Sequence, residues 1–201
     1  MTAIQCDNLQ DVQHYFLRKA REVAVLLPPR SAVLKTDAWN EVVGSVNGFE
    51  TVPVVGELGR SVEWTYVIEY RDDRAKAARE MFRDERVIVL RDDLRTVEAR
   101  WQFDAIFDLS TISYMPWDEA KQVLAKYHRW LKPGAPLAIA PWLTAGEATS
   151  GKGGWMPDWI FRHNAGEFID RLQEFFIIVE SESVYAHAGG VITMFVAARN
   201  P

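Results

Sequence analysis

The sequence predicts one α/β domain in which helices cover both faces of a mostly parallel, seven-stranded sheet. The chain has 201 residues, which fits one domain (1–201) better than two. Short apolar runs alternate with segments of helical periodicity, as in right-handed βαβ units. The last two apolar runs are separated only by a loop around Gly189-Gly190, so they predict a C-terminal antiparallel strand pair.

The N-terminal third begins with a predicted amphipathic helix. Apolar residues recur every three or four positions from Asp7 to Leu27, and two prolines follow, so we expect residues 1–30 to form a helical segment. Ala32–Leu34 predicts a buried strand that ends in a polar loop. Glycines and prolines between Asn47 and Arg60 indicate an irregular or partly extended connection.

The rest of the chain alternates more clearly between strands and helices. The apolar patterns predict strands at 64–69, 86–90, 103–107, 137–140, 175–180 and 191–197, and helices at 72–82 and 116–131. Asn164 and Glu167 have the spacing of a capping box and predict the start of a helix between the fifth strand and the antiparallel pair.

Composition and charge exclude several classes of function. The formal net charge of −5 disfavours broad electrostatic binding of nucleic acid. Cys6 is the sole cysteine and no two histidines have metal-ligand spacing, so we expect neither an internal disulfide nor a bound metal. The sequence has no apolar stretch of about 20 residues and no secretory signal at its N-terminus, so we expect no membrane span and a cytoplasmic location.

Acidic residues follow three predicted strands at the point where each strand ends. Glu69 closes one strand, Asp92 and Asp93 follow the next, and Asp108 ends a third, with Ser110 close behind. In open α/β sheets, ligands bind outside the carboxyl ends of the strands, so these side chains are expected to face one crevice. The alternative for Asp92, Asp93, Asp108 and Ser110 is a role in forming turns, and for Glu69 a solvated strand end.

Two segments carry a resemblance to a known family. Phe103–Thr111 begins with Phe-Asp and ends in a polar loop, and Trp130–Leu137 contains Leu-Lys-Pro-Gly before the next strand. This combination resembles the class I S-adenosylmethionine-dependent methyltransferases, a variant of the doubly wound fold, over residues 31–199. The chain also resembles a subgroup in which Leu-Lys-Thr-Asp-x-x-Asn-Glu, here Leu34–Glu41, replaces the glycine-rich loop.

The resemblance implies S-adenosylmethionine as cofactor and assigns residues to it. Glu69 would bind both ribose hydroxyls, and Asp92 or Asp93 would accept from the adenine amino group. Asp108 and Ser110 would line the methionine end of the cofactor. Asp37 and Asn40 stand where the family has its glycine loop. Either these side chains replace the backbone contacts of that loop, or affinity for the cofactor has been lost.

Three residues are candidates for a general base: His163, Tyr114 and Asp108. The alternative for His163 is an exposed or packed histidine without a catalytic role. Residues 141–163, which precede the capped helix, form a predicted substrate loop that combines glycines with Trp142, Trp155 and Trp159. The tryptophans predict either an aromatic-lined acceptor pocket with a glycine-hinged lid or packing of the core.

The resulting functional hypothesis is methyl transfer from S-adenosylmethionine to a small-molecule acceptor. One alternative is a catalytically inactive domain that binds the cofactor or a protein partner, which the missing glycine loop favours. A nicotinamide oxidoreductase is disfavoured, because no Gly-x-Gly-x-x-Gly follows any predicted strand.

Overall fold

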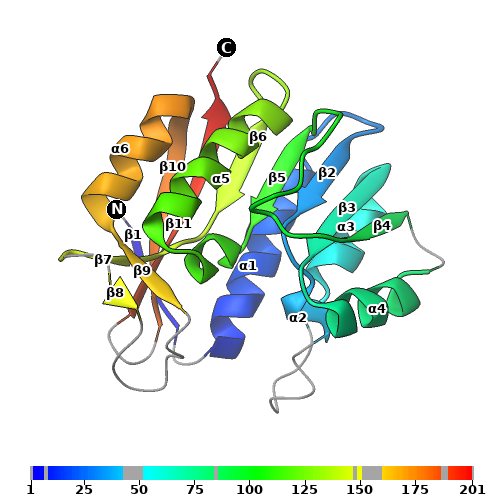
Figure 1. Cartoon of the computed structure of the whole chain (residues 1–201), viewed down its shortest axis with the longest axis horizontal. Coiled ribbons are helices and arrows are strands. Elements are labelled where there is room, and N and C mark those ends of the chain that lie inside the picture. Colours follow the sequence, from blue (N-terminus) through cyan, green and yellow to red (C-terminus); the bar gives the residue numbers. More distant parts are fainter. Residues whose placement is uncertain are drawn as a thin grey trace.

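The arrangement of the chain comes from a computed structural model, which describes residues 2–6, 9–42, 52–83, 86–146, 149–150, 160–186 and 190–200 (Figure 1). Five parallel strands form the centre of the sheet in the order β4-β3-β2-β5-β6. They are β2 (Ala32–Lys35), β3 (Trp64–Glu69), β4 (Val87–Arg91), β5 (Ala105–Asp108) and β6 (Pro136–Ile139).

Two long antiparallel strands continue the sheet beyond β6. β11 (Gly190–Arg199) runs antiparallel to β6 and also to β10 (Phe176–Ala186). All seven predicted strands are therefore present, and the mostly parallel sheet with its C-terminal antiparallel pair is confirmed.

Four short strands extend this sheet and correct two expectations. β1 (Thr2–Gln5) pairs in parallel with β10, so residues 1–30 are not helical throughout. The predicted substrate loop contains β7 (Trp142–Thr144), β8 (Thr149–Ser150) and β9 (Phe161–Asn164). β7 pairs with β11 and β9, so part of that loop belongs to the sheet.

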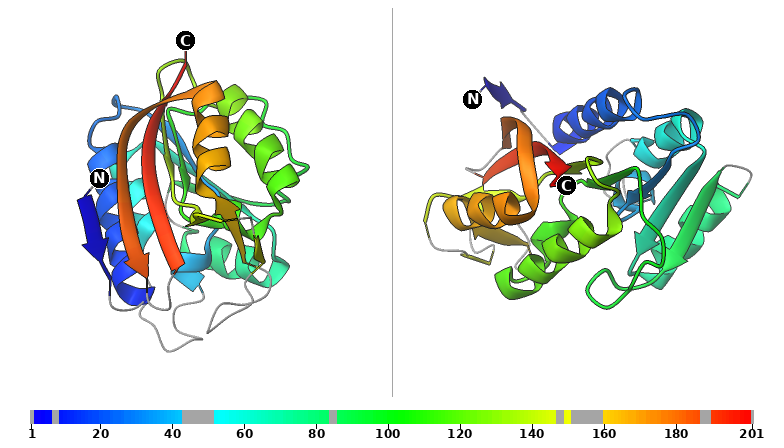
Figure 2. Two further views of the ribbon diagram at one scale, coloured as in Figure 1. Left: turned by 90° about the vertical axis from the view of Figure 1, so that its left-hand side faces the viewer. Right: turned by 90° about the horizontal axis from the view of Figure 1, so that it is seen from above.

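Helices cover both faces of the sheet (Figure 2). α1 (Leu9–Ala24), α2 (Trp39–Val42), α3 (Val54–Ser61) and α4 (Asp72–Met81) lie on one face. The 3₁₀ helix η2 (Thr111–Tyr114), α5 (Trp117–Trp130) and α6 (Ala165–Phe175) lie on the other. Successive side chains of a strand point to opposite faces, so Val33 packs with the α1 side and Leu34 with the α5 side.

The expectation of an irregular connection at 47–60 was wrong for the part that the structure describes. Val54–Ser61 forms α3 although it contains Gly56 and Gly59. Val54, Val55 and Leu58 are buried against the sheet and α1, and this packing outweighs the low helix propensity of glycine. Residues 47–51 lie outside the described part.

The predicted cap at the start of α6 is confirmed. The Asn164 side chain accepts a hydrogen bond of 3.0 Å from the Glu167 N–H. This bond satisfies one backbone donor of the first helical turn. It fixes the point where β9 ends and α6 begins.

Candidate functional site

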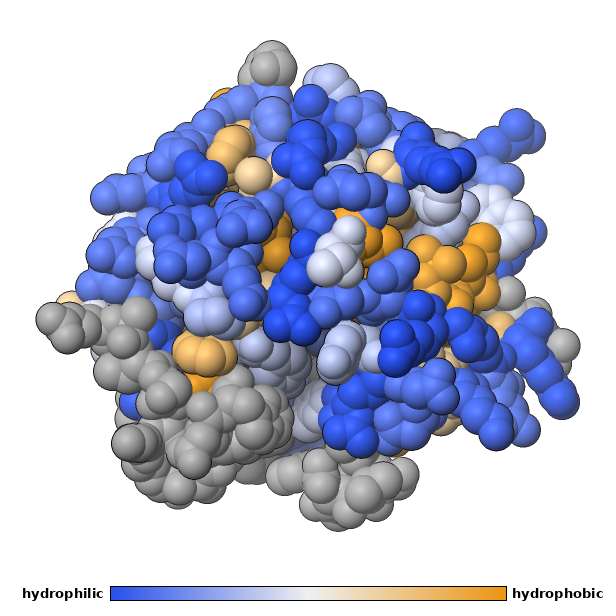
Figure 3. All heavy atoms as spheres, in the orientation of Figure 1, coloured by the Kyte–Doolittle hydropathy of each residue, from blue (hydrophilic) through white to orange (hydrophobic). Residues whose placement is uncertain are grey.

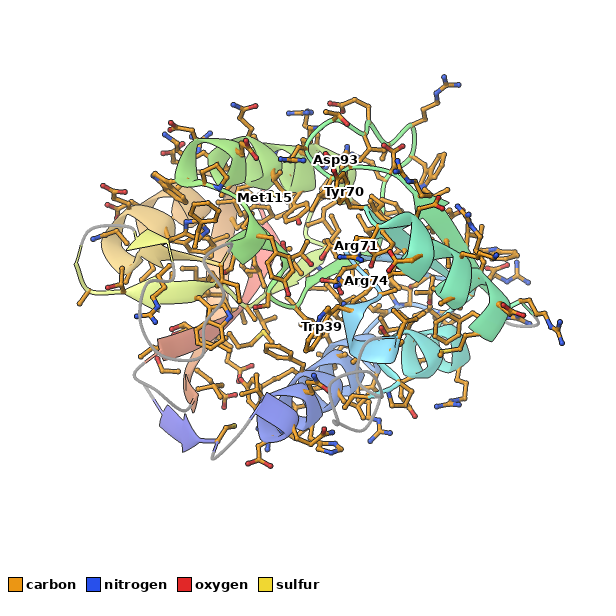
Figure 4. The ribbon with its side chains drawn as sticks, turned by 60° about the horizontal axis from the view of Figure 1, so that its bottom comes forward. Trp39, Tyr70, Arg71, Arg74, Asp93 and Met115 are labelled. Carbon is orange, nitrogen blue, oxygen red and sulfur yellow. The ribbon has the colours of Figure 1, made fainter. Side chains whose placement is uncertain are left out.

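A cavity of about 400 Å³ opens at the carboxyl ends of β2, β3 and β4, with η2 beside it. Figure 4 shows side chains from α2, α4, the segment after β4 and the end of η2 arranged around this space. The lining residues are Thr36, Asp37, Ile68, Glu69, Tyr70, Arg71, Arg74, Asp92, Asp93, Leu94, Arg95, Thr111, Tyr114 and Met115. The cavity has the size of a small-molecule site and the location expected of one in an open α/β sheet.

Glu69 forms part of the cavity wall and is held by backbone donors. Its carboxylate accepts hydrogen bonds from the Ala38 N–H at 3.1 Å and the Arg71 N–H at 2.9 Å. Burial, and then the nearby charge of Asp37, raise the pKa of Glu69 above its ordinary value. Each carboxylate oxygen can accept more than one hydrogen bond, so both keep capacity for a ligand hydroxyl.

Asp37 occupies the place where the resemblance expects a glycine loop. Its carboxylate lies 2.8 Å from the ammonium of Lys35, which is fully buried. The Trp39 N–H donates to the same oxygen at 3.1 Å, and the Thr111 hydroxyl donates to the other. Burial by itself raises the pKa of Asp37, but the charge of Lys35 and these hydrogen bonds hold it below its ordinary value. Asp37 is therefore an ionised group at the cavity wall.

Asn40, the other predicted residue of this stretch, belongs to α2. Its side chain lies outside the described part. Ser110 caps η2 with a φ of 90° and is not one of the residues that line the cavity. The structure thus places Ser110 in a turn, which was the alternative role for this residue.

Asp92 and Asp93 both line the cavity and also stabilise the turn after β4. Asp92 accepts a hydrogen bond from the Asp93 N–H at 2.8 Å. Asp93 accepts from the Arg95 N–H at 2.9 Å and pairs with the Arg95 guanidinium at 2.7 Å. The Arg95 side chain holds the pKa of Asp93 below its ordinary value. The two roles considered from the sequence, facing the crevice and forming a turn, therefore coexist.

Among the three candidate bases, Tyr114 is the one that lines the cavity. Asp108 is fully buried, and its oxygens accept from the Tyr127 hydroxyl at 2.6 Å and the Ile112 N–H at 3.0 Å. Burial raises the pKa of Asp108 to about 6. Both Asp108 oxygens thus serve internal contacts in this structure.

His163 is likewise fully buried, on β9. Its ring lies against Trp117 and Phe168, with centroid separations of 5.4 Å and 6.0 Å, and one ring nitrogen is 3.2 Å from the Ile112 carbonyl oxygen. Burial lowers the pKa of His163. These contacts match the packed histidine that the sequence left as an alternative.

Of the three tryptophans in the predicted substrate loop, Trp142 is the one that the structure describes. Trp142 is 4% exposed, lies on β7 and belongs to the hydrophobic core. Trp155 and Trp159 lie outside the described residues.

Several lining residues were missed by the sequence analysis. Ile68, Leu94 and Met115 supply apolar surface, while Arg71 and Arg74 supply positive charge. Leu94 and Met115 lie in connections without regular structure, where no periodicity marks an inward position. Arg71 and Arg74 come two and five residues after Glu69, a predicted ligand residue. This closeness in the sequence was the available signal that they could reach the same cavity.

The face of the molecule shown in Figure 3 is mainly hydrophilic, and its hydrophobic side chains form small, separate areas. No helix of the described residues is both long and apolar enough to cross a membrane.

The chain is similar in fold to several solved structures. It matches the [4+2]-cyclase SpnF with a TM-score of 0.73 and 16% identity, covering 97% of this chain and 83% of that one. It also matches the Burkholderia thailandensis 1,6-didemethyltoxoflavin-N1-methyltransferase, a structure with bound 1,6-didemethyltoxoflavin and S-adenosylhomocysteine. The TM-score is 0.69 and the identity 15%, over 92% of this chain and 79% of that one. The N-methyltransferase NodS from Bradyrhizobium japonicum gives 0.69 and 14% over 97% and 89%.

These comparisons define the class of fold. No family model and no curated protein sequence matches the chain. The structural neighbours include class I S-adenosylmethionine-dependent methyltransferases, and their identities of 14 to 16% indicate likeness of fold. One neighbour is named for cyclisation, so the fold alone does not determine the reaction.

Proposed function

We propose that this protein transfers a methyl group from S-adenosylmethionine to a small-molecule acceptor. The observation that carries the proposal is the position of Glu69. This carboxylate ends β3, faces the cavity, and is held there by two backbone N–H groups. Such a fixed pair of acceptor oxygens suits the two hydroxyls of a ribose.

The other lining residues fit the remaining parts of the cofactor. Ile68, Leu94 and Met115 would pack against the purine, and Asp92 or Asp93 would accept from its amino group. The ionised Asp37 would stabilise the ammonium of the methionine portion. The residues present therefore suit a nucleoside joined to a cationic chain.

The contribution of the protein to the reaction is mainly one of placement. When bound, the cofactor would supply an electrophilic methyl group on a sulfonium, and the neutral thioether S-adenosylhomocysteine would be the leaving group. The cavity would hold this methyl in line with the acceptor and exclude water. Burial, followed by the charge of Asp37, raises the pKa of Tyr114, so its phenol stays protonated at neutral pH and would position the acceptor as a hydrogen-bond donor.

Calorimetric titration with S-adenosylmethionine and S-adenosylhomocysteine tests the proposal. We expect micromolar binding to the intact chain, weakened by about 1–3 kcal/mol in Glu69→Gln, because the amide cannot accept with both of its terminal atoms. Glu80→Gln is the matched control, since Glu80 is an exposed residue of α4 away from the cavity. Thermal unfolding of each variant verifies that it is folded.

The outcomes separate the proposal from its alternative. Binding that depends on Glu69, followed by methyl transfer in a screen of small-molecule acceptors with radiolabelled cofactor, would support catalysis. Binding without transfer to any acceptor would favour the catalytically inactive domain. Absence of binding to the folded wild-type chain would overturn the cofactor assignment.

A further inference from the structure

The stretch that replaces the glycine loop has already used most of its backbone donors. The Ala38 N–H donates to Glu69 and the Trp39 N–H to Asp37, each at 3.1 Å. The N–H groups of Thr36 and Glu41 donate to backbone carbonyls at 3.1 Å and 3.2 Å. These four N–H groups are therefore not available to an anionic group of a ligand, which turns attention to the cationic side chains that line the cavity.

Three arginines line the cavity, and two of them are paired. Arg71 forms an ion pair with Asp73 at 3.0 Å, and Arg95 forms one with Asp93 at 2.7 Å. Arg74 forms no hydrogen bond and no ion pair with any residue in the described part of the chain. It is the lining cation that an anionic ligand could engage without breaking an existing pair.

The position of Arg74 suits this role. It lies in the first turn of α4, is half-buried, and is seen between Arg71 and Trp39 at the cavity in Figure 4. Burial raises the pKa of both Glu69 and Tyr114, and the charge of Arg74 opposes this rise in each. Arg74 lines the same cavity as Glu69 at the end of β3 and Tyr114 at the end of η2.

We propose that Arg74 binds the carboxylate of the amino-acid portion of the cofactor and thereby makes the site selective for adenosyl compounds that carry a carboxylate. A guanidinium can donate two parallel hydrogen bonds to one carboxylate, which gives both energy and orientation. Asp37, which lies between β2 and α2 and lines the same cavity, would contact the ammonium of the amino-acid portion of the cofactor. This inference rests on the proposed function.

Titration with two ligands isolates the interaction. S-adenosylhomocysteine carries the carboxylate, and its decarboxylated analogue keeps the ammonium and lacks only that group. For Arg74→Met we expect affinity for S-adenosylhomocysteine to fall about tenfold to 100-fold, as for loss of hydrogen bonds to a charged group. Affinity for the decarboxylated analogue should change by less than about twofold, since that ligand makes no such bonds. Arg74→Lys should restore part of the loss, because it keeps the charge without the two-pronged geometry.

Lys76→Met is the matched control, since it removes a positive charge from an exposed position on the same helix. It should leave the affinity for both ligands unchanged. Because both ligands are measured on the same folded variant, a general loss of structure would weaken both equally. Equal weakening, or no weakening, in Arg74→Met would overturn the role of Arg74 while the cofactor assignment stands. Failure of the wild-type chain to bind either compound would overturn both.

Discussion

The ammonium of Lys35 lies 2.8 Å from the carboxylate of Asp37, and Lys35 has no exposed surface. Lys35 is the last residue of β2, and its ammonium also donates to the Asp37 carbonyl oxygen at 3.2 Å. These two contacts fix the conformation of the chain directly after β2. The Lys35–Asp37 pair thus lies in the stretch where the family resemblance expects a glycine-rich loop.

Lys35→Met should strongly destabilise the protein. The substitution leaves the Asp37 carboxylate buried without its cation, and the loss of one partner from a buried pair costs about 3–5 kcal/mol. Urea unfolding at pH 7 would measure this change in the free energy of unfolding. The double variant Lys35→Met/Asp37→Asn should lose less than the sum of the single losses, and strictly additive losses would contradict the pairing.

The sequence predicted those parts of the fold that depend on local pattern. The strand at Trp64–Glu69 and the cap at Asn164 follow from hydrophobic runs and side-chain spacing, and both are confirmed. α3 was missed because tertiary packing outweighed its two glycines. β7 has three residues, too few to show an alternating pattern.

The site was predictable where position in the sheet decides it. Glu69 ends β3 and Asp92 directly follows the adjacent parallel strand β4, and both reach the cavity, as the topology requires. Asp108 is also the last residue of a strand, β5, yet its partners Tyr127 and Ile112 come from elements whose approach only the folded chain shows. Arg74 was missed because closeness to Glu69 along the chain, the signal that was available, does not by itself distinguish a lining arginine from a solvated one.

Glu41→Gln should stabilise the protein above neutral pH. Burial raises the pKa of Glu41 from 4.5 to about 7, and one of its oxygens is buried without a hydrogen-bond partner among the residues that the structure describes. Between pH 4.5 and 7 the folded state binds the proton more tightly than the unfolded state, so stability falls as pH rises through this range. The glutamine cannot ionise and should be more stable than the wild type at pH 8, by as much as about 3 kcal/mol.

The measurement is the free energy of unfolding in urea at pH 5, 6.5 and 8. The difference between Glu41→Gln and the wild type should grow with pH. The exposed Glu80 provides the control, and Glu80→Gln should follow the wild type at every pH. A constant difference across the range would show that the Glu41 carboxyl is not perturbed.

His163→Phe should reduce the sensitivity of the fold to acid. Burial lowers the pKa of His163 in the folded state, so below its unfolded value of about 6.5 the proton binds preferentially to the unfolded chain. Stability from this group is therefore full above pH 6.5 and is lost as pH falls. The variant should lose less stability than the wild type between pH 7.5 and 5.5, while the exposed His14→Gln should behave like the wild type.

Tyr127→Phe tests whether Asp108 serves the fold rather than the ligand. The variant removes the hydroxyl that donates to the buried Asp108 carboxylate at 2.6 Å, and should cost about 1–3 kcal/mol. Burial already raises the pKa of Asp108 to about 6, and loss of this hydrogen bond would raise it further. The penalty should therefore be larger at pH 8, where the carboxylate is charged, than at pH 5.

Neither Tyr127 nor Asp108 lines the cavity, so the affinity of Tyr127→Phe for S-adenosylhomocysteine should stay within about twofold of wild type, since no ligand hydrogen bond is lost. A selective loss of affinity without loss of stability would instead assign Asp108 to the binding site.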